Sequence, residues 1–160
     1  MKPKHWRFVL FVYAVFMIWM MFFRLRSGVW EDSSDYWEHV TTQYNLVPFH
    51  MIVSYTRVLL RTLKQDGFTW SYQLWAVCRN LFGNIGMLIP LGFLLPASFP
   101  RLRRPGKTLL AVTGIIVFLE LAQLFTIAGH CDIDDLILNL LGAAMGYGLF
   151  SLLRDRLVKE

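Results

Sequence analysis

Residues 132–148 have the sequence DIDDLILNLLGAAMGYG, in which three aspartates are followed directly by a long apolar run. Within that run Asn139, Gly142 and Gly146 recur at helical spacing. Carboxylates beside long apolar segments cost free energy unless another group pairs with them or uses them. The stretch therefore predicts either a functional site or a structural cap at the start of a helix.

The composition of the 160-residue chain indicates which solvent surrounds these aspartates. Hydrophobic residues make up 56% of the chain and charged residues only 17%, and the mean hydropathy is +0.45. Such a chain is too apolar for a soluble domain of this length. We predict an all-α membrane protein, because helices satisfy their own backbone hydrogen bonds in lipid.

The apolar segments predict a bundle of about four transmembrane helices, at about 7–23, 74–99, 108–128 and 136–153. Each approaches or exceeds the roughly 20 residues that a helix needs to cross the bilayer. Pro90 should kink the second span. The first span lacks a small-x-small cleavage site and is predicted to be an uncleaved anchor. The chain 1–160 then forms a single membrane domain with an outer segment at 24–73.

The distribution of Lys and Arg predicts how the protein is oriented. Basic residues gather at the amino terminus, after the second span and at the carboxyl terminus, and none lies in the connection after the third span. By the positive-inside rule, both termini lie in the cytoplasm and the aspartates lie outside the cell membrane. The net charge of +5 therefore reflects orientation and lipid contact, and no feature indicates nucleic-acid binding.

Within the outer segment, residues 48–64 are typical of an amphipathic helix. Arg57, Arg61 and Lys64 form a basic stripe beside apolar residues at helical spacing. The pattern fits an extracytoplasmic interfacial helix on anionic lipid and equally a lid packed on the spans. The first half of the outer segment, around Glu31–Glu38, is polar and is predicted to be a loop.

Polar residues within the spans gather at one depth. At a rise of about 1.5 Å per residue, all of them fall in the outer half of the membrane. Charged side chains at that depth face the bundle interior, where they pair or meet water. The candidate ligand-binding residues are Arg79, Asn84, Glu120, Gln123, Asp132, Asp134, Asp135 and Asn139.

Several motifs follow one another in a specific order: Asn45-Leu46-Val47-Pro48-Phe49, Gly83-Asn84 with Pro90–Pro96, Glu120 with Gln123, and Asp132–Asp135 with Asn139, Gly142 and Gly146. From about Asn45 to Tyr147, the chain resembles the VanZ-like family. The resemblance implies a small bacterial membrane protein of the cell envelope. The founding member of the family is associated with low-level resistance to teicoplanin, a glycopeptide antibiotic with a lipid tail. Family members often carry an Arg shortly before the first Asp, where this chain has Gly129, His130 and Cys131.

Two functional interpretations of the polar residues stay open. In the first, an outward-facing pocket binds an amphiphile without a cofactor, and a cell-wall lipid precursor or a lipoglycopeptide fits the family context. In the second, a metal-dependent enzyme uses Asp132, Asp134 and Asp135 to hold Mg²⁺ or Mn²⁺ and acts on a lipid-linked pyrophosphate. The sequence contains no recognisable nucleophile and base pair, which favours binding over catalysis.

A structural interpretation stays open beside them. Asp132 or Asp134 caps the fourth span, and Arg79 and Glu120 form a buried ion pair. The glycine pair of the fourth span allows another helix to approach closely. These roles leave several of the amide side chains unexplained.

The cysteines and histidines add little evidence for any one function. Cys78 and Cys131 both fall near the predicted outer face, and we expect them to be free thiols although a disulfide is geometrically allowed there. His130 adjoins the carboxylates, but a single loop histidine is more often a surface residue than a metal ligand.

Overall fold

The computed structural model of the chain describes residues 3–24, 36–64, 72–126, 129 and 131–157. Glu31, Asp32, Asp35 and His130 lie outside the described residues. The elements, in chain order, are α1 (Pro3–Trp19), the π-helical turn η1 (Met20–Arg24), α2 (Tyr36–Thr42), β1 (Tyr44–Asn45), α3 (His50–Lys64), α4 (Tyr72–Ser98), the 3-10 turn η3 (Pro100–Leu102), α5 (Pro105–Phe125), β2 (Cys131–Asp132) and α6 (Ile133–Leu157).

Four helices in the described part of the chain are long and apolar enough to cross a membrane, at Lys4–Phe22, Val77–Ser98, Pro105–Phe125 and Ile133–Leu157. The predicted all-α membrane bundle is therefore confirmed. The helix ends differ from the predicted span ends by a few residues, because backbone hydrogen bonding continues where the apolar run stops. α4 runs on as one helix through Pro90 and Pro96.

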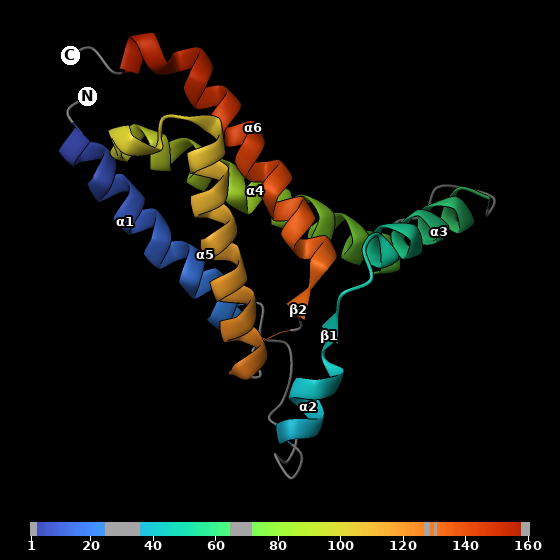
Figure 1. Cartoon of the computed structure of the whole chain (residues 1–160). Helices are drawn as coiled ribbons and strands as arrows, with labels where there is room; N and C mark the ends of the chain where they lie inside the picture. Colours follow the sequence, from blue (N-terminus) through green and yellow to red (C-terminus); the bar gives the residue numbers. More distant parts are fainter. Residues whose placement is uncertain (1–2, 25–35, 65–71, 127–128, 130, 158–160) are drawn as a thin grey trace.

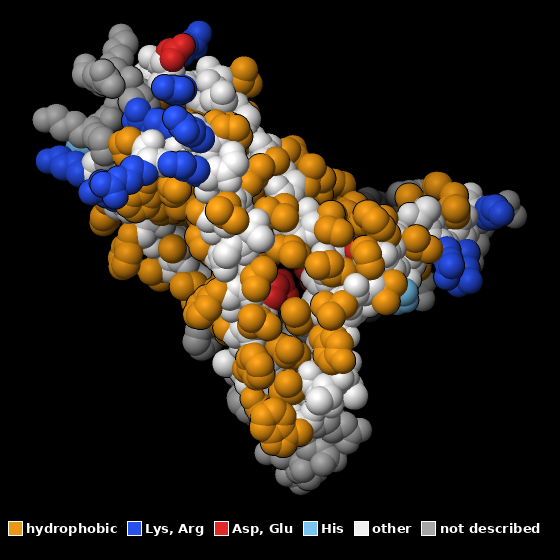
Figure 2. Space-filling model, viewed as in Figure 1, with side chains coloured by type: hydrophobic (Ala, Val, Ile, Leu, Met, Phe, Trp, Pro, Cys, Tyr) orange, Lys and Arg blue, Asp and Glu red, His pale blue; other side chains and the backbone are white. Residues whose placement is uncertain are grey.

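Both termini lie at one end of the bundle, beside the connection between α4 and α5 (Figure 1). Contacts tie this end together: Arg7 Nε donates to the Ser98 carbonyl over 3.4 Å, and the Tyr147 hydroxyl donates to the Arg103 carbonyl over 2.8 Å. Lys and Arg side chains gather there on the visible face, as Figure 2 shows. The bundle therefore has one strongly basic end.

The pairing of α4 with α6 forms the centre of the bundle, since these two helices share the most extensive contact. A Cβ atom on Gly142 would overlap the carbonyl oxygen of Ile85, and one on Gly146 would overlap that of Ile89. Gly92 of α4 approaches the backbone of Ala143 in the same way. The predicted role of the glycine pair in close helix packing is confirmed.

The remaining spans pack around this pair through a compact apolar core. Its buried members are Met17, Met21, Leu88, Leu91, Leu95, Val112, Ile116, Leu119 and Ala143. Aromatic rings extend the core toward the basic end, with Phe93 placed 5.7 Å from Trp6 and 6.1 Å from Phe150 between ring centroids. The face of α1 that points away from this core exposes large apolar side chains, as expected of a helix that meets lipid.

Two short elements stand where a loop was predicted. α2 and β1 precede α3, and β1 pairs in parallel with β2, which places Tyr44 opposite Cys131 and Asn45 opposite Asp132. The N–H of Cys131 donates to the Gln43 carbonyl over 3.0 Å. A pairing of two residues has no alternating pattern, so hydrophobic periodicity could not predict it.

α3 projects from the bundle beside the first half of α4 (Figure 1). It begins at His50, so Pro48, the first residue of the predicted helix 48–64, lies ahead of the helix. Phe49 between them has a positive φ of 64°, an uncommon value for a residue with a side chain. The chain thus makes a sharp turn directly before α3.

The close contact of α4 and α6 predicts that Gly146→Ala destabilises the protein, because its methyl group would force the helices apart. We expect a loss of about 1–3 kcal/mol, seen as a lower melting temperature in detergent. Gly148→Ala, on the same helix with nothing within 4 Å of its Cβ, is the matched control. It should melt at the wild-type temperature or above, since Ala favours helix by up to about 1 kcal/mol over Gly. Equal melting temperatures for the two variants would contradict the packing.

Candidate functional site

A cavity of about 870 Å³ lies among α1, the first half of α4, the end of α5 and the start of α6. Figure 2 shows a hollow in the visible face with an acidic side chain inside it and hydrophobic side chains around it. The predicted site residues that line the cavity are Arg79, Asn84, Glu120, Gln123, Asp132, Asp135 and Asn139. Asp134 does not line it.

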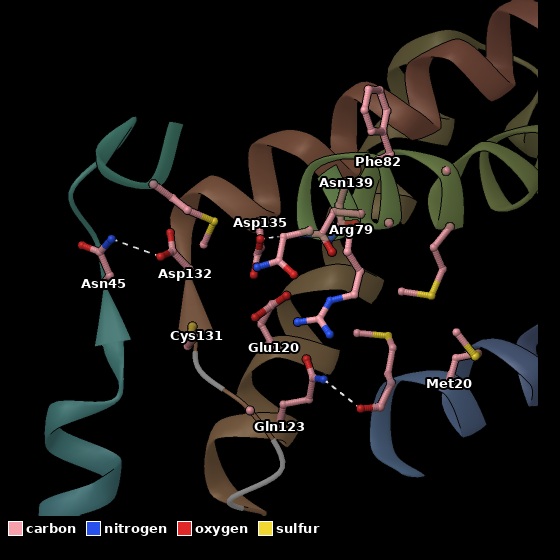
Figure 3. Close-up of a pocket in the computed structure, with 18 of the residues that line it drawn as sticks. Met20, Asn45, Arg79, Phe82, Glu120, Gln123, Cys131, Asp132, Asp135 and Asn139 are labelled. Carbon is pink, nitrogen blue, oxygen red and sulfur yellow. Dashed lines mark hydrogen bonds between the residues drawn. The ribbon is translucent and has the colours of Figure 1, made fainter. Parts of the chain in front are cut away.

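The walls of the cavity differ in chemistry. α1 and its π-helical turn contribute Tyr13, Phe16, Met20 and Met21, and α4 adds Phe82 among other residues. The carboxylates and amides come mainly from α4, α5 and the start of α6, as Figure 3 shows. The cavity is therefore amphipathic, with an apolar side at α1 and a polar side at the carboxylates.

Glu120 and Asn139 are the most buried polar residues of this wall. Glu120 is 6% exposed and Asn139 is 3% exposed, and both line the cavity. Oε2 of Glu120 and Oδ1 of Asn139 have no hydrogen-bonding partner in the structure. A buried acceptor without a partner costs about 1–3 kcal/mol, and more when it is charged. The packing of the protein alone does not account for these two atoms.

Asn84 joins α4 to α6 at the polar wall, because its Nδ2 donates to Oδ1 of Asp135. One turn earlier, Asn80 Nδ2 donates over 2.8 Å to the hydroxyl oxygen of Tyr55, which links α4 to α3. Burial raises the pKa of Tyr55, so its hydroxyl stays protonated at neutral pH. Gln123 Nε2 donates over 3.2 Å to the Met21 carbonyl and holds α5 against the end of α1.

Asp132 has both of its oxygens engaged. Oδ1 accepts the N–H of Asp134 over 2.8 Å, and Oδ2 accepts Nδ2 of Asn45 over 3.1 Å. The first bond satisfies a free N–H at the start of α6, as expected of a helix cap. The second supports the pairing of β1 with β2. The predicted capping role is confirmed for Asp132.

Asp134 is fully buried and caps a different helix from the one predicted. Its Oδ1 accepts the N–H of Phe49 over 2.5 Å, and its Oδ2 accepts the N–H of Met51 over 2.7 Å. The N–H of Phe49 lies directly before α3 and that of Met51 lies in its first turn, where the helix dipole favours a negative charge. The carboxylate of Asp134 thus fastens α3 to the first turn of α6.

The three aspartates do not converge on one point, because their oxygens serve different partners. Among the described residues, no group of three or more His, Cys, Asp or Glu side chains is arranged to hold a metal ion. Both oxygens of Asp134 accept backbone N–H groups, and both oxygens of Asp132 are also engaged. The geometry therefore does not support a metal centre built from Asp132, Asp134 and Asp135.

The structural interpretation of Arg79 and Glu120 as a buried ion pair is wrong, because the two side chains do not pair in the structure. Arg79 is exposed, and its Cζ lies 5.1 Å from the ring centroid of Trp75 in a cation–π contact. A guanidinium at the exposed end of α4 keeps more of its hydration than one buried beside Glu120 would. Its side chain lines the cavity from the α4 side (Figure 3).

Cys78 and Cys131 are free thiols, as predicted. Burial raises the pKa of the Cys131 thiol, so it remains protonated and weakly reactive at neutral pH. Cys131 lines the cavity as a small apolar group.

The sequence did not predict the contacts by which Asn45, Met51, Tyr55 and Asn80 join the outer segment to the spans. Asn45 lies in a motif that the sequence analysis had singled out, and that motif was the available signal. No pattern in the sequence pairs it with Asp132, 87 positions away.

The fold and the cavity together define a helical integral membrane protein with a polar site among its spans. The chain belongs to the VanZ/LLP1 family, whose model matches residues 10–154. That match begins within α1, so it is longer than the part from Asn45 to Tyr147 that carries the motifs. Searches of curated proteins and of solved structures found no match.

The role of Asp134 predicts a local effect of Asp134→Asn. The amide keeps an acceptor but loses the charge, which weakens two charge-assisted hydrogen bonds worth about 1.5–3 kcal/mol each. We expect faster amide hydrogen exchange over residues 49–53 while α4 and α5 remain protected. Asp155→Asn, an exposed change on the same helix, should leave exchange over residues 49–53 unchanged. Wild-type exchange in Asp134→Asn would rule out this anchoring role.

Proposed function

We propose that this VanZ/LLP1 protein binds the polar headgroup of an amphiphile in the cavity, with the apolar part of the ligand against α1. The observation that carries the proposal is a cavity of about 870 Å³, built from membrane-spanning helices, that joins a polar wall to an apolar one. Ligand pockets typically occupy about 300–1,000 Å³ and combine apolar walls with a few placed polar groups. Arg79 is the basic side chain available to an anionic part of the headgroup.

In this proposal, the cavity opens toward the outer leaflet of the bacterial cell membrane. The support is the separation of charge along the bundle, because the termini and the basic connection between α4 and α5 gather at the end remote from α2 and β1. Basic residues in short connections favour the cytoplasmic side. Both termini would then be cytoplasmic, and α3 would be extracytoplasmic.

In this orientation α3 serves as an interfacial helix that is also fastened to the bundle. Asp134 holds its first turn, and Tyr55 meets Asn80 of α4. Arg57, Arg61 and Lys64 are exposed. Each would gain about 1 kcal/mol near an anionic leaflet. The two interpretations of this helix, on lipid and against the spans, are thereby compatible.

The family context favours a ligand of the cell envelope, either a cell-wall lipid precursor or a lipoglycopeptide of the teicoplanin type. Sequestering either molecule in the outer leaflet would reduce the encounter between antibiotic and precursor, which gives a physical route to glycopeptide resistance. A metal-dependent reaction on a lipid-linked pyrophosphate has less support, since the hydrogen bonds of Asp132 and Asp134 occupy their oxygens. A purely structural role leaves Glu120 and Asn139 unexplained.

A cavity-filling variant tests this function. Gly86 lines the cavity and has nothing within 4 Å of a Cβ atom, so Gly86→Phe should fill the space without disturbing helix packing. We expect native mass spectrometry to show an amphiphile retained by the wild-type protein and lost from Gly86→Phe. Any rise in teicoplanin resistance that the wild-type protein gives a sensitive host should disappear too.

Gly114→Phe is the matched control for this variant, because Gly114 is also exposed, also open at Cβ and outside the cavity. It should retain the amphiphile. Retention that is equal in the two variants, or absent from the wild-type protein, would refute binding in the cavity.

Cysteine labelling tests the orientation. In a protein whose native cysteines are replaced by alanine, Val47→Cys should react with a membrane-impermeant maleimide on intact cells, because Val47 is 62% exposed near the cavity. Arg101→Cys, at the basic end, should react only after the cells are permeabilised. The reverse pattern would place the cavity on the cytoplasmic side.

A further inference from the structure

We infer that the cavity takes a headgroup bearing a protonated primary amine, with the amine seated against Glu120 and Asn139. This inference rests on the proposed function, since it concerns which amphiphile the cavity binds.

Two buried atoms of the polar wall have no hydrogen-bonding partner in the protein. Oε2 of Glu120 and Oδ1 of Asn139 are both acceptors, and their residues line the same cavity from α5 and α6. A ligand group that donates hydrogen bonds to both would satisfy them. An ammonium group has three donors and no acceptor, and it is small enough to lie between side chains of two helices.

The charge of the lining points the same way. Glu120, Asp132 and Asp135 contribute carboxylates to the cavity, and Arg79 is the one Lys or Arg among the lining residues that the structure describes. A phosphate or carboxylate placed at Glu120 would therefore meet like charge, which costs several kcal/mol at a desolvated contact. A cation at the same place would be attracted by the carboxylates around it.

Several other polar side chains of the wall each have a hydrogen-bonding partner within the protein. Asp135 accepts from Asn84, Asp132 accepts from Asn45, and Gln123 donates to the Met21 carbonyl. Among the described lining residues, Glu120 and Asn139 are the ones whose fully buried acceptors have no partner. The contrast with Asp134, whose two oxygens are both satisfied by the protein, separates the ligand-facing carboxylate from the structural one.

Arg79 gives the ligand a direction. It approaches the cavity from α4, whereas Glu120 comes from α5 and Asn139 from α6 (Figure 3). An anionic group next to the amine would meet Arg79, and the tail would meet the apolar side chains of α1. The cavity therefore fits an amphiphile whose headgroup carries an amine beside an anionic group.

The test compares lipids that share their acyl chains and differ in the headgroup: phosphatidylethanolamine, phosphatidylcholine and phosphatidic acid. Binding to the purified full chain is measured by native mass spectrometry. We expect phosphatidylethanolamine to bind about tenfold more tightly than either of the others, the factor given by one charge-assisted hydrogen bond. Phosphatidylcholine keeps the positive charge but has no N–H, so it separates hydrogen bonding from charge alone.

Two variants locate the preference. Glu120→Gln removes the charge and should abolish the tenfold preference, while Asp155→Asn, an equal loss of charge on the exposed end of α6, should keep it. Asn139→Leu has a similar volume without the acceptor and should weaken the preference, which keeps the test available if Glu120→Gln does not fold.

Competition by soluble amphiphiles identifies the source of the amine. Displacement of phosphatidylethanolamine by dodecylamine but not by dodecyl phosphate would support a site open to free amines. Displacement by neither, with the lipid preference intact, would support recognition of an amine within a membrane lipid.

A phosphatidic acid affinity equal to that of phosphatidylethanolamine, or an unchanged preference in Glu120→Gln, would overturn the inference and leave amphiphile binding standing. Failure of every lipid to bind, with no difference between Gly86→Phe and Gly114→Phe, would overturn the proposed function itself.

Discussion

The close approach of the α4 and α6 backbones is the constraint on which the rest of the structure depends. At Gly92, Gly142 and Gly146 no side chain separates the two helices, so their carbonyl groups and Cα atoms come into direct contact. This contact fixes the register of one helix against the other. Asn84 therefore lies opposite Asp135, and Asn139 lies in the wall of the cavity. Lipid supplies little hydrophobic drive for helices to associate, so backbone packing and polar contacts must supply it.

Two buried carboxylates differ in how far the protein itself satisfies their oxygens. Asp134 has no exposed surface, and both of its oxygens accept N–H groups at the start of α3. Glu120 is nearly as buried, yet one of its oxygens has no partner. A fully satisfied carboxylate stabilises the fold, whereas one left unsatisfied costs stability that a ligand can restore. The motif around Asp134 thus positions the outer segment, and Glu120 faces the cavity.

The outer segment completes the cavity as well as covering it. β1 brings Tyr44 and Asn45 to the rim by pairing with β2, and Met51 of α3 lines the cavity beside them. Asn45 and Met51 reach the start of α6 through hydrogen bonds to Asp132 and Asp134. The same aspartates also organise the start of α6. A substitution of either aspartate therefore alters α6, the rim and the cavity together.

The sequence by itself determined the membrane class, the four spans, the family and seven of the polar residues that line the cavity. Hydropathy over about 20 residues and the depth of polar residues within a span can be read from the sequence, because the thickness of the bilayer fixes both. Only the tertiary structure decided the partner of each polar group: that Asp134 holds α3, that Asp132 meets Asn45, and that Arg79 stacks on Trp75 instead of pairing with Glu120. The physical reason is that a hydrogen bond depends on positions within a fraction of an ångström. Those positions follow from how helices far apart in the chain pack, which no periodicity along a single helix contains.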